Sequence, residues 1–281
     1  MQARFTIAFL VVLALLGGCV RRQGVSRVEW TTMGTVAAVQ AKPSGAANAA
    51  GEASIEVRSM FTEVETLLNA HSPESEISRL ASLPDDCVLK SCNERMRPCY
   101  EAAFALQKAT GGAFNPRWRG AKTLDLGAIA KGFAVDLAAE HVHAPGDVSV
   151  LVDLGGNLKS AKGAWRTGVK DPCGNGIAAS VDLGEGEALA TSAKYFRGDH
   201  IRDGRNGGVV ENGVASVTVL CGSAMWADGL STTLFVLGPE EGRAFLDRRL
   251  SELMGERRVE VLWILSDGRR LTYPAATRFS Q

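Results

Sequence analysis

Hydrophobic and polar residues follow two different periods along this chain. In several stretches apolar residues recur every three or four positions, which is the spacing of one face of an α-helix. These stretches run over about Ser54–His71, Glu94–Thr110, Ile129–His141 and Ser223–Val236, and Pro239 marks the start of a further helix. Shorter runs that alternate, or that are rich in β-branched residues, predict strands. These runs are Glu29–Val39, Leu124–Leu126, Val148–Leu154, Trp165–Val169, Ala178–Leu183, Val214–Leu220, Val259–Leu265 and Arg269–Tyr273.

The order of these elements predicts the fold class. Strands and helices follow one another without the regular strand–helix–strand alternation of a doubly wound sheet. Gly111-Gly112 end a predicted helix, and Ser266-Asp267-Gly268 join the last two strands as a hairpin. Ala41–Ala53 is rich in Ala, Gly, Pro and Ser, which predicts a loop. We therefore expect an α+β fold of mostly antiparallel sheets with packed helices.

The N-terminus has the pattern of an export signal. Arg4 gives a positive start, and the apolar run from Phe5 to Leu16 is short for a membrane span. Leu16-Gly17-Gly18-Cys19 resembles the lipobox of bacterial lipoproteins, in which the cysteine carries the lipid. We predict a signal peptide over 1–18, lipidation at Cys19, a tether over 19–28 and one domain over 29–281. The protein would then lie on the periplasmic face of the inner or outer membrane. An ordinary secretory signal with a chance cysteine is the alternative.

The charge balance and the cysteine spacing argue against nucleic-acid binding and against a zinc site. Lys plus Arg and Asp plus Glu both number 31, so the chain has no net charge to attract a nucleic-acid backbone. Export would place the remaining cysteines in an oxidising compartment. Two of Cys87, Cys92 and Cys99 are close enough in sequence to pair, whereas a zinc site lacks the accompanying histidine pair.

The segment from Leu124 to Asp136 is the strongest candidate for binding an anion. It is expected to run from a strand through the turn at Gly127 into a helix, and a helix N-terminus favours negative charge. Lys131 lies in the first turn of that helix, and Asp125 precedes the bend. A tight turn with a solvated lysine is the alternative interpretation.

A second candidate site lies on the helix that follows Ser223. Asp228 and Thr232 are four residues apart and therefore share one face of the helix. A carboxylate and a hydroxyl suit Mg²⁺, and an aspartate among apolar neighbours is costly unless it is paired or binds a metal. The alternative is an aspartate that faces solvent beside a hydrogen-bonded threonine. His200 is a further candidate acid or base, although a single histidine without partners is more often structural.

Taken together, these motifs resemble the bacterial ApbE family, the FAD:protein FMN transferases. The motifs occur in the family's order over nearly the whole mature chain. They are Met33-Gly34-Thr35, Ser75–Leu80, Thr110–Phe114, Asp125–Asp136, Val152–Asn157, Ala190–Ser192, His200-Ile201 with Asp203, and Ser223–Asp228 with Thr232.

The resemblance implies a role for individual residues. Asp228, Thr232 and a backbone carbonyl near Ala128 would bind Mg²⁺. Lys131 would face the diphosphate or the incoming protein, and His200 falls where the family has a histidine linked to catalysis. The FAD pocket would be lined by Met33, Ala113, Phe114 and Asp125.

Some positions depart from the family pattern. His71 replaces an aromatic residue before Ser75, and Asn115 replaces an aspartate after Phe114. The family's Pro-Arg-Thr-Gly is Gly204-Arg205-Asn206-Gly207 here. These changes affect the expected contacts to the flavin and the adenine more than the metal site.

The resemblance implies Mg²⁺-dependent transfer of FMN from FAD to a threonine of an acceptor protein, with release of AMP. By analogy with the family, the acceptor would be a subunit of a membrane electron-transfer complex. Two alternatives remain open from the sequence: an FAD pyrophosphatase that gives FMN and AMP, and a lipoprotein that binds FAD without catalysis.

Overall fold

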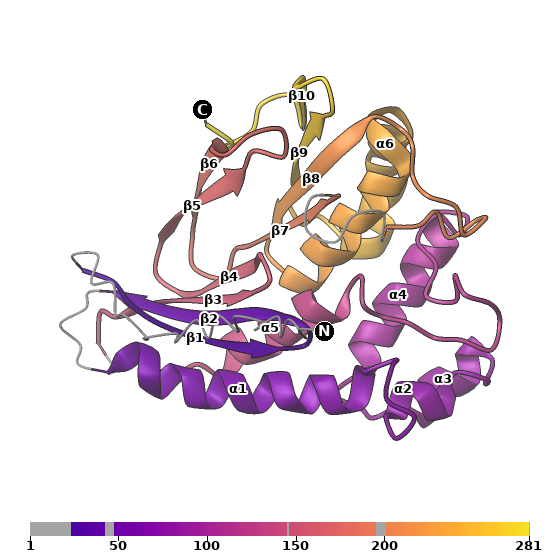
Figure 1. The fold of residues 1–281 in the computed structure, drawn as a ribbon, viewed down its shortest axis with the longest axis horizontal. Helices are drawn as coiled ribbons and strands as arrows, with labels where there is room; N and C mark the ends of the chain where they lie inside the picture. Colours follow the sequence, from indigo (N-terminus) through magenta and orange to yellow (C-terminus); the bar gives the residue numbers. More distant parts are fainter. Residues whose placement is uncertain (1–23, 43–47, 145, 195–200, 281) are drawn as a thin grey trace, which may run out of the picture.

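A computed structural model describes residues 24–42, 48–144, 146–194 and 201–280 of the chain (Figure 1). Its main feature is a sheet of eight strands in which every neighbouring pair is antiparallel. In spatial order the strands are β1 (Ser26–Thr32), β2 (Thr35–Lys42), β3 (Ser149–Leu154), β4 (Asn157–Lys162), β7 (Ala188–Ala193), β8 (Val214–Cys221), β9 (Glu260–Leu265) and β10 (Arg270–Tyr273).

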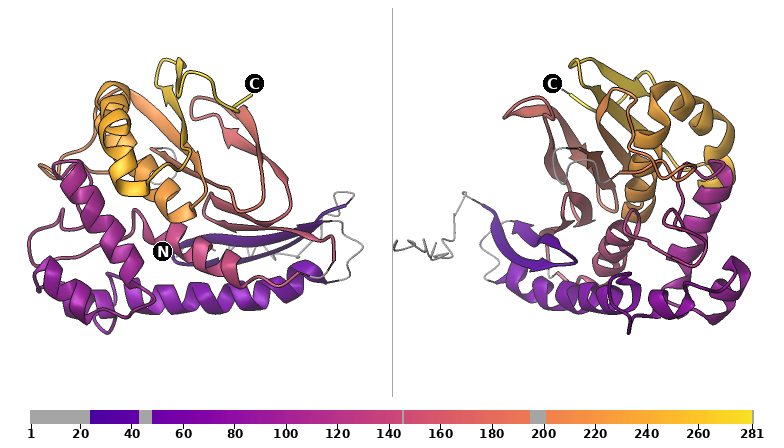
Figure 2. Two further views of the ribbon diagram at one scale, coloured as in Figure 1. Left: turned by 180° about the vertical axis from the view of Figure 1, so that it is seen from behind. Right: turned by 45° about the vertical axis from the view of Figure 1, so that its right-hand side comes forward.

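Helices pack against one face of this sheet and enclose the larger hydrophobic core. Phe61, Phe133 and Leu230 enter that core from three different helices. The two views of Figure 2 show the helices together on one side of the sheet. They are α1 (Ala49–Leu68), α2 (Glu76–Leu80), α3 (Asp85–Ser91), α4 (Arg97–Ala109), α5 (Ala130–His141) and α6 (Ala224–Met254).

A two-stranded sheet covers the other face. It consists of β5 (Trp165–Lys170) and β6 (Ile177–Leu183). Trp165 and Leu183 pack with Leu151 and Leu262 of the main sheet in a second, smaller core. The prediction of an α+β fold with mostly antiparallel sheets is therefore confirmed.

The N-terminal strand prediction was wrong in a specific way. The chain does not run straight through Glu29–Val39 but turns back at Met33-Gly34, and Thr32 pairs with Thr35. Both turn residues have positive φ angles, 48° and 67°. Two consecutive left-handed residues make the tight turn that matches the twist of a hairpin. The first strand also starts at Ser26, within the predicted tether.

Two further boundaries differ from the prediction. Much of the predicted loop over Ala41–Ala53 is regular structure, because β2 continues to Lys42 and α1 begins at Ala49. Alanine favours helix, so the alanine-rich stretch extends α1 toward its N-terminus. Leu124–Leu126 is not a strand; its backbone bonds within its own region instead, with Asp125 N donating to Pro116 O and Ala130 N donating to Leu126 O, both at 2.8 Å.

Two close contacts fix α5 against α6. A Cβ atom at Gly132 would lie 2.1 Å from the carbonyl oxygen of Ala224, so only glycine allows the helices to approach this closely. Asp136 accepts hydrogen bonds from Ser223 Oγ at 2.6 Å and from the N–H groups of Ala224 and Met225 at 2.9 Å. Its carboxylate thereby satisfies N–H groups that the first turn of α6 leaves unpaired.

The cysteines of the described chain are all free thiols, so the pairing considered for Cys87, Cys92 and Cys99 does not occur there. None of the helices among the described residues combines the length and apolar character that a membrane crossing requires. The predicted signal peptide and Cys19 lie outside the described residues.

Candidate functional site

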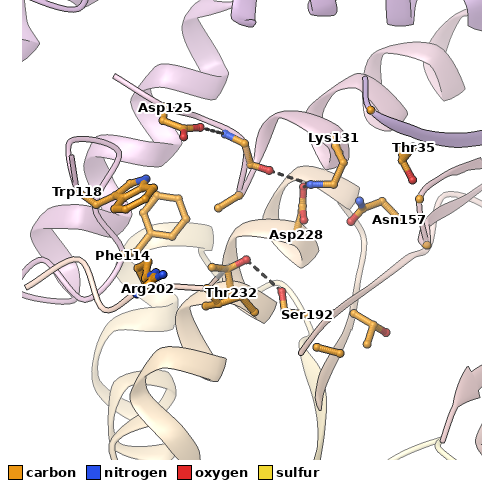
Figure 3. A pocket seen from close by; sticks show the side chains of 18 of the residues that line it. Thr35, Phe114, Trp118, Asp125, Lys131, Asn157, Ser192, Arg202, Asp228 and Thr232 are labelled. Carbon is orange, nitrogen blue, oxygen red and sulfur yellow. Dashed lines mark hydrogen bonds and ion pairs between the residues drawn. The ribbon is translucent and has the colours of Figure 1, made fainter. Parts of the chain in front are cut away.

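A cleft of about 770 Å³ lies where the N-terminal hairpin, the bend before α5 and helix α6 meet. Its residues form three groups along its length, as Figure 3 shows. Phe114, Trp118 and Arg202 lie at one end, Thr35 and Asn157 at the other, and Lys131, Asp228 and Thr232 between them.

The bend before α5 is held by its own side chains. Asp125 Oδ1 accepts a hydrogen bond from the N–H of Gly127 at 2.8 Å. Lys131, in the first turn of α5, donates from Nζ to the carbonyl oxygen of Gly127 at 2.8 Å. The backbone of the bend therefore lines the cleft at Gly127, and the Lys131 ammonium group lies against it.

Asp228 is the buried carboxylate of the site. The residue is only 5% exposed, yet it lines the cleft. Its Oδ2 accepts a hydrogen bond from the Gly132 N–H at 3.0 Å and lies 3.7 Å from Lys131 Nζ. Burial raises the pKa of the Asp228 carboxyl, while the Lys131 cation and the Gly132 N–H favour the charged form.

Thr232 follows Asp228 by one helical turn and also lines the cleft. Its Oγ1 lies 3.1 Å from Ser192 Oγ on β7, and Ser192 Oγ lies 2.8 Å from Ser231 Oγ. These hydroxyls connect α6 to the sheet beside the buried carboxylate.

The middle of the cleft holds one positive charge. One ammonium group, Lys131 Nζ, touches both the Gly127 carbonyl and the Asp228 carboxylate, so the bend and α6 meet around a positive charge. Within the described ranges no group of three or more His, Cys, Asp or Glu side chains could hold a metal ion. The expected donor set is different, because it consists of one carboxylate, one hydroxyl and one backbone carbonyl, all of them oxygen ligands.

Two tight turns, at Met33-Gly34 and at Gly155-Gly156, form the hairpin end of the cleft. Gly155 has a φ of 62°, and a Cβ there would lie 2.7 Å from Thr35 Oγ1, so the two turns approach closely because residue 155 is glycine. Asp153 Oδ1 accepts a hydrogen bond from Gly156 N at 3.0 Å. Burial raises the pKa of Asp153, a second carboxyl that lines the cleft.

The structure brings most of the predicted site residues together. The cleft is lined by His71, Ala113, Phe114, Asn115, Asp125, Ala128, Lys131, Asp228 and Thr232. Their individual roles stay predictions. His200 lies outside the described residues, so its placement is not part of this geometry.

Met33 is the exception among the described candidates. It is not among the residues that line the cleft; it packs against the larger core, and its neighbours Gly34 and Thr35 line the cleft instead. The reason is the hairpin turn, because the left-handed backbone at Met33 directs the following two residues, rather than its own side chain, toward the opening.

No role is predicted from the sequence for several residues that line the cleft, among them Trp118, Arg202 and Asp153. Trp118 lies between the recognised motifs, whereas Arg202 and Asp153 lie within motifs but were assigned no role there. One signal for Trp118 was available: it is a large aromatic residue between Arg117 and Arg119 in a segment without helical or strand spacing. Arg202 carries no comparable signal.

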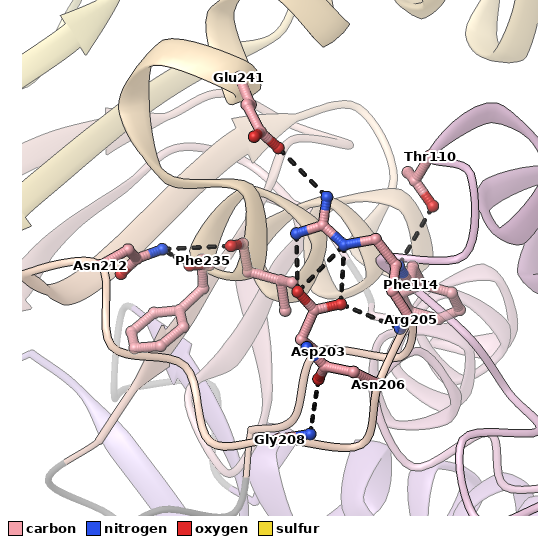
Figure 4. A network of polar contacts seen from close by, with 10 residues as sticks. Thr110, Phe114, Asp203, Arg205, Asn206, Gly208, Asn212, Phe235 and Glu241 are labelled. Carbon is pink, nitrogen blue, oxygen red and sulfur yellow. Dashed lines mark hydrogen bonds and ion pairs between the residues drawn. The ribbon is translucent and has the colours of Figure 1, made fainter.

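The loop that bears Arg202 is fastened by a polar network (Figure 4). Arg205 donates to both carboxylate oxygens of Asp203, from Nε to Oδ1 at 2.9 Å and from Nη2 to Oδ2 at 2.7 Å, and contacts Glu241 of α6 at 3.4 Å. Asn212 Nδ2 donates to the Phe235 carbonyl of α6 at 2.8 Å. The loop is therefore tied to α6 at two points.

A family model supports the resemblance seen in the motifs. The model of the ApbE family matches residues 117–254, which include the bend, α5 and all of α6. Curated relatives named FAD:protein FMN transferase are 36% identical over 136 residues in Vibrio cholerae and over 157 residues in Rhodobacter capsulatus. These alignments cover 43% and 52% of this chain but only 40% and 28% of the relatives, so the chain matches less than half of the length of each.

Solved structures extend the likeness to nearly the whole chain. The flavin transferase ApbE from Vibrio cholerae superposes with a TM-score of 0.70 at 23% identity, covering 92% of this chain and 98% of that chain. The flavinyl transferase ApbE from Pseudomonas stutzeri, in its apo form, superposes with a TM-score of 0.67 at 25% identity, covering 89% and 95%. Residues 117–254 thus match the ApbE family model, and the chain has the fold of the ApbE flavin transferases.

Proposed function

We propose that this protein transfers the FMN half of FAD to a threonine hydroxyl of an acceptor protein. The observation that carries the proposal is the meeting of the Gly127 bend with the buried Asp228 carboxylate around one positive charge. A diphosphate needs such a place, because its negative charge is stabilised by cations and by the N-terminus of a helix. The cleft volume of about 770 Å³ falls in the range of small-molecule sites.

In the reaction, the threonine oxygen attacks the phosphorus on the FMN side of the diphosphate. A new phosphorus–oxygen bond forms, the bond to the bridging oxygen breaks, and AMP leaves with that oxygen. The hydroxyl proton passes to solvent or to a base. The protein's contribution is to hold the two reactants in line and to balance the charge of the diphosphate.

Asp228, Thr232 and the carbonyl of the bend near Ala128 are the groups that would hold Mg²⁺. Mg²⁺ prefers oxygen ligands and would neutralise diphosphate charge when bound. Lys131 Nζ contacts both the Gly127 carbonyl and the Asp228 carboxylate, so it would move aside when Mg²⁺ binds between them. We further propose that Lys131 contacts the diphosphate during the reaction.

The cellular setting is proposed from the N-terminal sequence. Leu16-Gly17-Gly18-Cys19 after an apolar run supports a lipid anchor at Cys19 and a position on the periplasmic face of a membrane. An acceptor at that surface would be a subunit of a membrane electron-transfer complex. His200 is proposed to take part in catalysis on the strength of the sequence motif alone.

The decisive experiment combines the protein with FAD and Mg²⁺, with and without a candidate acceptor, and measures AMP and the acceptor mass. Formation of AMP together with an acceptor that gains the mass of FMN supports transfer. AMP without a labelled acceptor identifies an FAD pyrophosphatase, and FAD binding without AMP identifies a binding protein. Asp228→Asn should abolish AMP formation, whereas Asp182→Asn, on an exposed strand position, should not.

A further inference from the structure

The far end of the cleft holds an aromatic ring and a cation that the proposed chemistry does not use. Trp118 is half-buried and lines the cleft, and Figure 3 shows it beside Phe114. The Arg119 guanidinium lies 4.6 Å from the centroid of the Trp118 ring. Arg119 is in turn 3.5 Å from the Asp125 carboxylate at the bend. The Trp118 indole therefore packs against the Arg119 guanidinium, and the ion pair with Asp125 fixes the position of that guanidinium.

The segment that carries Trp118 is fixed by its neighbour in the chain. Arg117 donates from Nε to Asp85 Oδ1 at 2.8 Å, from Nη1 to the Ala81 carbonyl at 2.6 Å and from Nη2 to the Leu83 carbonyl at 2.7 Å. These bonds tie the segment to the region of α2 and α3. A ring whose position is set before a ligand arrives costs less ordering entropy on binding.

Arg202 supplies the second observation. It lines the same end of the cleft, and its guanidinium makes no hydrogen bond or ion pair with any other described residue. The backbone around it is nevertheless fixed, because Gly204 N donates to the Ala113 carbonyl at 3.0 Å and Arg202 pairs with Val209. A half-buried guanidinium that lines a cleft and has no partner among the described residues is a group available to a ligand.

We propose that Trp118 and Arg202 form a subsite for one planar ring system of the dinucleotide, either the flavin or the adenine. The ring stacks on the indole, and the guanidinium of Arg202 lies against the ring or bonds its polar edge. This subsite rests on the proposed function in taking FAD as the ligand. It makes Trp118 and Arg202 the residues that decide which ring is accepted.

The test measures equilibrium binding of FAD, riboflavin and adenosine to the full protein by calorimetry. Trp118→Ala should weaken FAD binding between about 5-fold and 150-fold, the range expected for loss of one stacked ring. Trp118→Phe keeps a stacking surface and should restore most of the affinity. Arg202→Met should weaken FAD binding more than Arg202→Lys does, because lysine keeps the charge. Arg166→Met, on the exposed face of β5, is the matched control.

The ring is identified by the smaller probes. A loss of affinity by Trp118→Ala for riboflavin alone assigns the flavin to this subsite, and a loss for adenosine alone assigns the adenine. Unchanged affinity of both Trp118→Ala and Arg202→Met for FAD overturns the subsite while leaving transfer intact. If wild-type protein binds riboflavin or adenosine through Trp118 but releases no AMP from FAD and Mg²⁺, the subsite stands and the proposed function fails.

Discussion

The N–H of Gly132 donates a 3.0 Å hydrogen bond to Oδ2 of Asp228, and this bond joins α5 to α6 beside the cleft. The bond exists because residue 132 has no side chain. A Cβ there would lie 2.1 Å from the Ala224 carbonyl oxygen and 2.7 Å from Asp228 Cβ. The same glycine thus sets both the spacing of the helices and the position of the buried carboxylate.

Gly132→Ala should destabilise the fold and displace Asp228. Overpacking at a contact this close costs about 1–3 kcal/mol. Urea unfolding measures the loss, and FAD-dependent AMP release measures the displacement. Gly176→Ala is the control, because a Cβ at that position meets no atom within 4 Å. Equal stability of the two variants would contradict the close packing of α5 against α6.

Asp136→Asn should weaken the start of α6. The Asp136 carboxylate bonds three groups at the N-terminus of α6 and lies 2.7 Å from Lys159 Nζ, with 14% of its side chain exposed. Loss of a mostly buried pair together with a helix cap costs about 3 kcal/mol. Thermal or urea unfolding measures this cost.

The exposed ion pair of Asp182 with Arg166 provides the comparison for Asp136. Its side chains are 70% and 63% exposed, so Asp182→Asn should change stability by less than about 0.5 kcal/mol. A loss in Asp136→Asn no larger than in Asp182→Asn would show that the contacts of Asp136 do not stabilise α6.

Thr232→Val should reduce the affinity for a divalent cation while leaving the fold intact. Valine keeps the shape of threonine but removes the oxygen proposed as a metal ligand. We expect Mn²⁺ to bind at least about tenfold more weakly, measured by electron paramagnetic resonance.

The neighbouring residue gives a matched control for Thr232. Thr233 is buried, and its Oγ1 donates to the Gly229 carbonyl at 2.8 Å within the helix. Thr233→Val therefore removes a hydroxyl from the same helix without touching the cleft. Identical Mn²⁺ binding by Thr232→Val and wild type would argue against Thr232 as a metal ligand.

The C-terminal segment should contribute stability that depends on pH. Arg278 bonds both carboxylate oxygens of Glu187 at 2.8 Å, and this pairing lowers the pKa of Glu187 below its usual 4.5. A carboxyl with a lowered folded-state pKa stabilises the fold fully above 4.5, and the contribution is lost as pH falls through the folded-state value.

The difference in melting temperature between wild type and Glu187→Gln should therefore be largest near neutral pH. It should shrink as the pH falls from about 6 to about 3. A difference that is independent of pH over this range would mean that the charge of Glu187 does not contribute to stability. Glu252→Gln, whose side chain is 61% exposed, controls for the general effect of removing a carboxylate.

The sequence by itself determined the local elements whose signals are short-range. The spacing of apolar residues located α5 and most of the strands, and Gly111-Gly112 marked the end of α4. It also placed Asp228 and Thr232 on one helix face, because residues four positions apart in a helix are neighbours on the same face. The motif order identified a family likeness that the comparisons support over residues 117–254.

Only the tertiary structure decided how these segments meet. Whether residues 29–39 form one strand or a hairpin depended on the left-handed backbone at Met33. A left-handed backbone is uncommon for a residue other than glycine, so methionine at this position does not predict a turn. The contact of Lys131 with Asp228, and the position of Trp118 and Arg202 in one cleft, join positions far apart in the chain. No periodicity encodes such contacts, because they arise from packing between elements rather than from the conformation of any one of them.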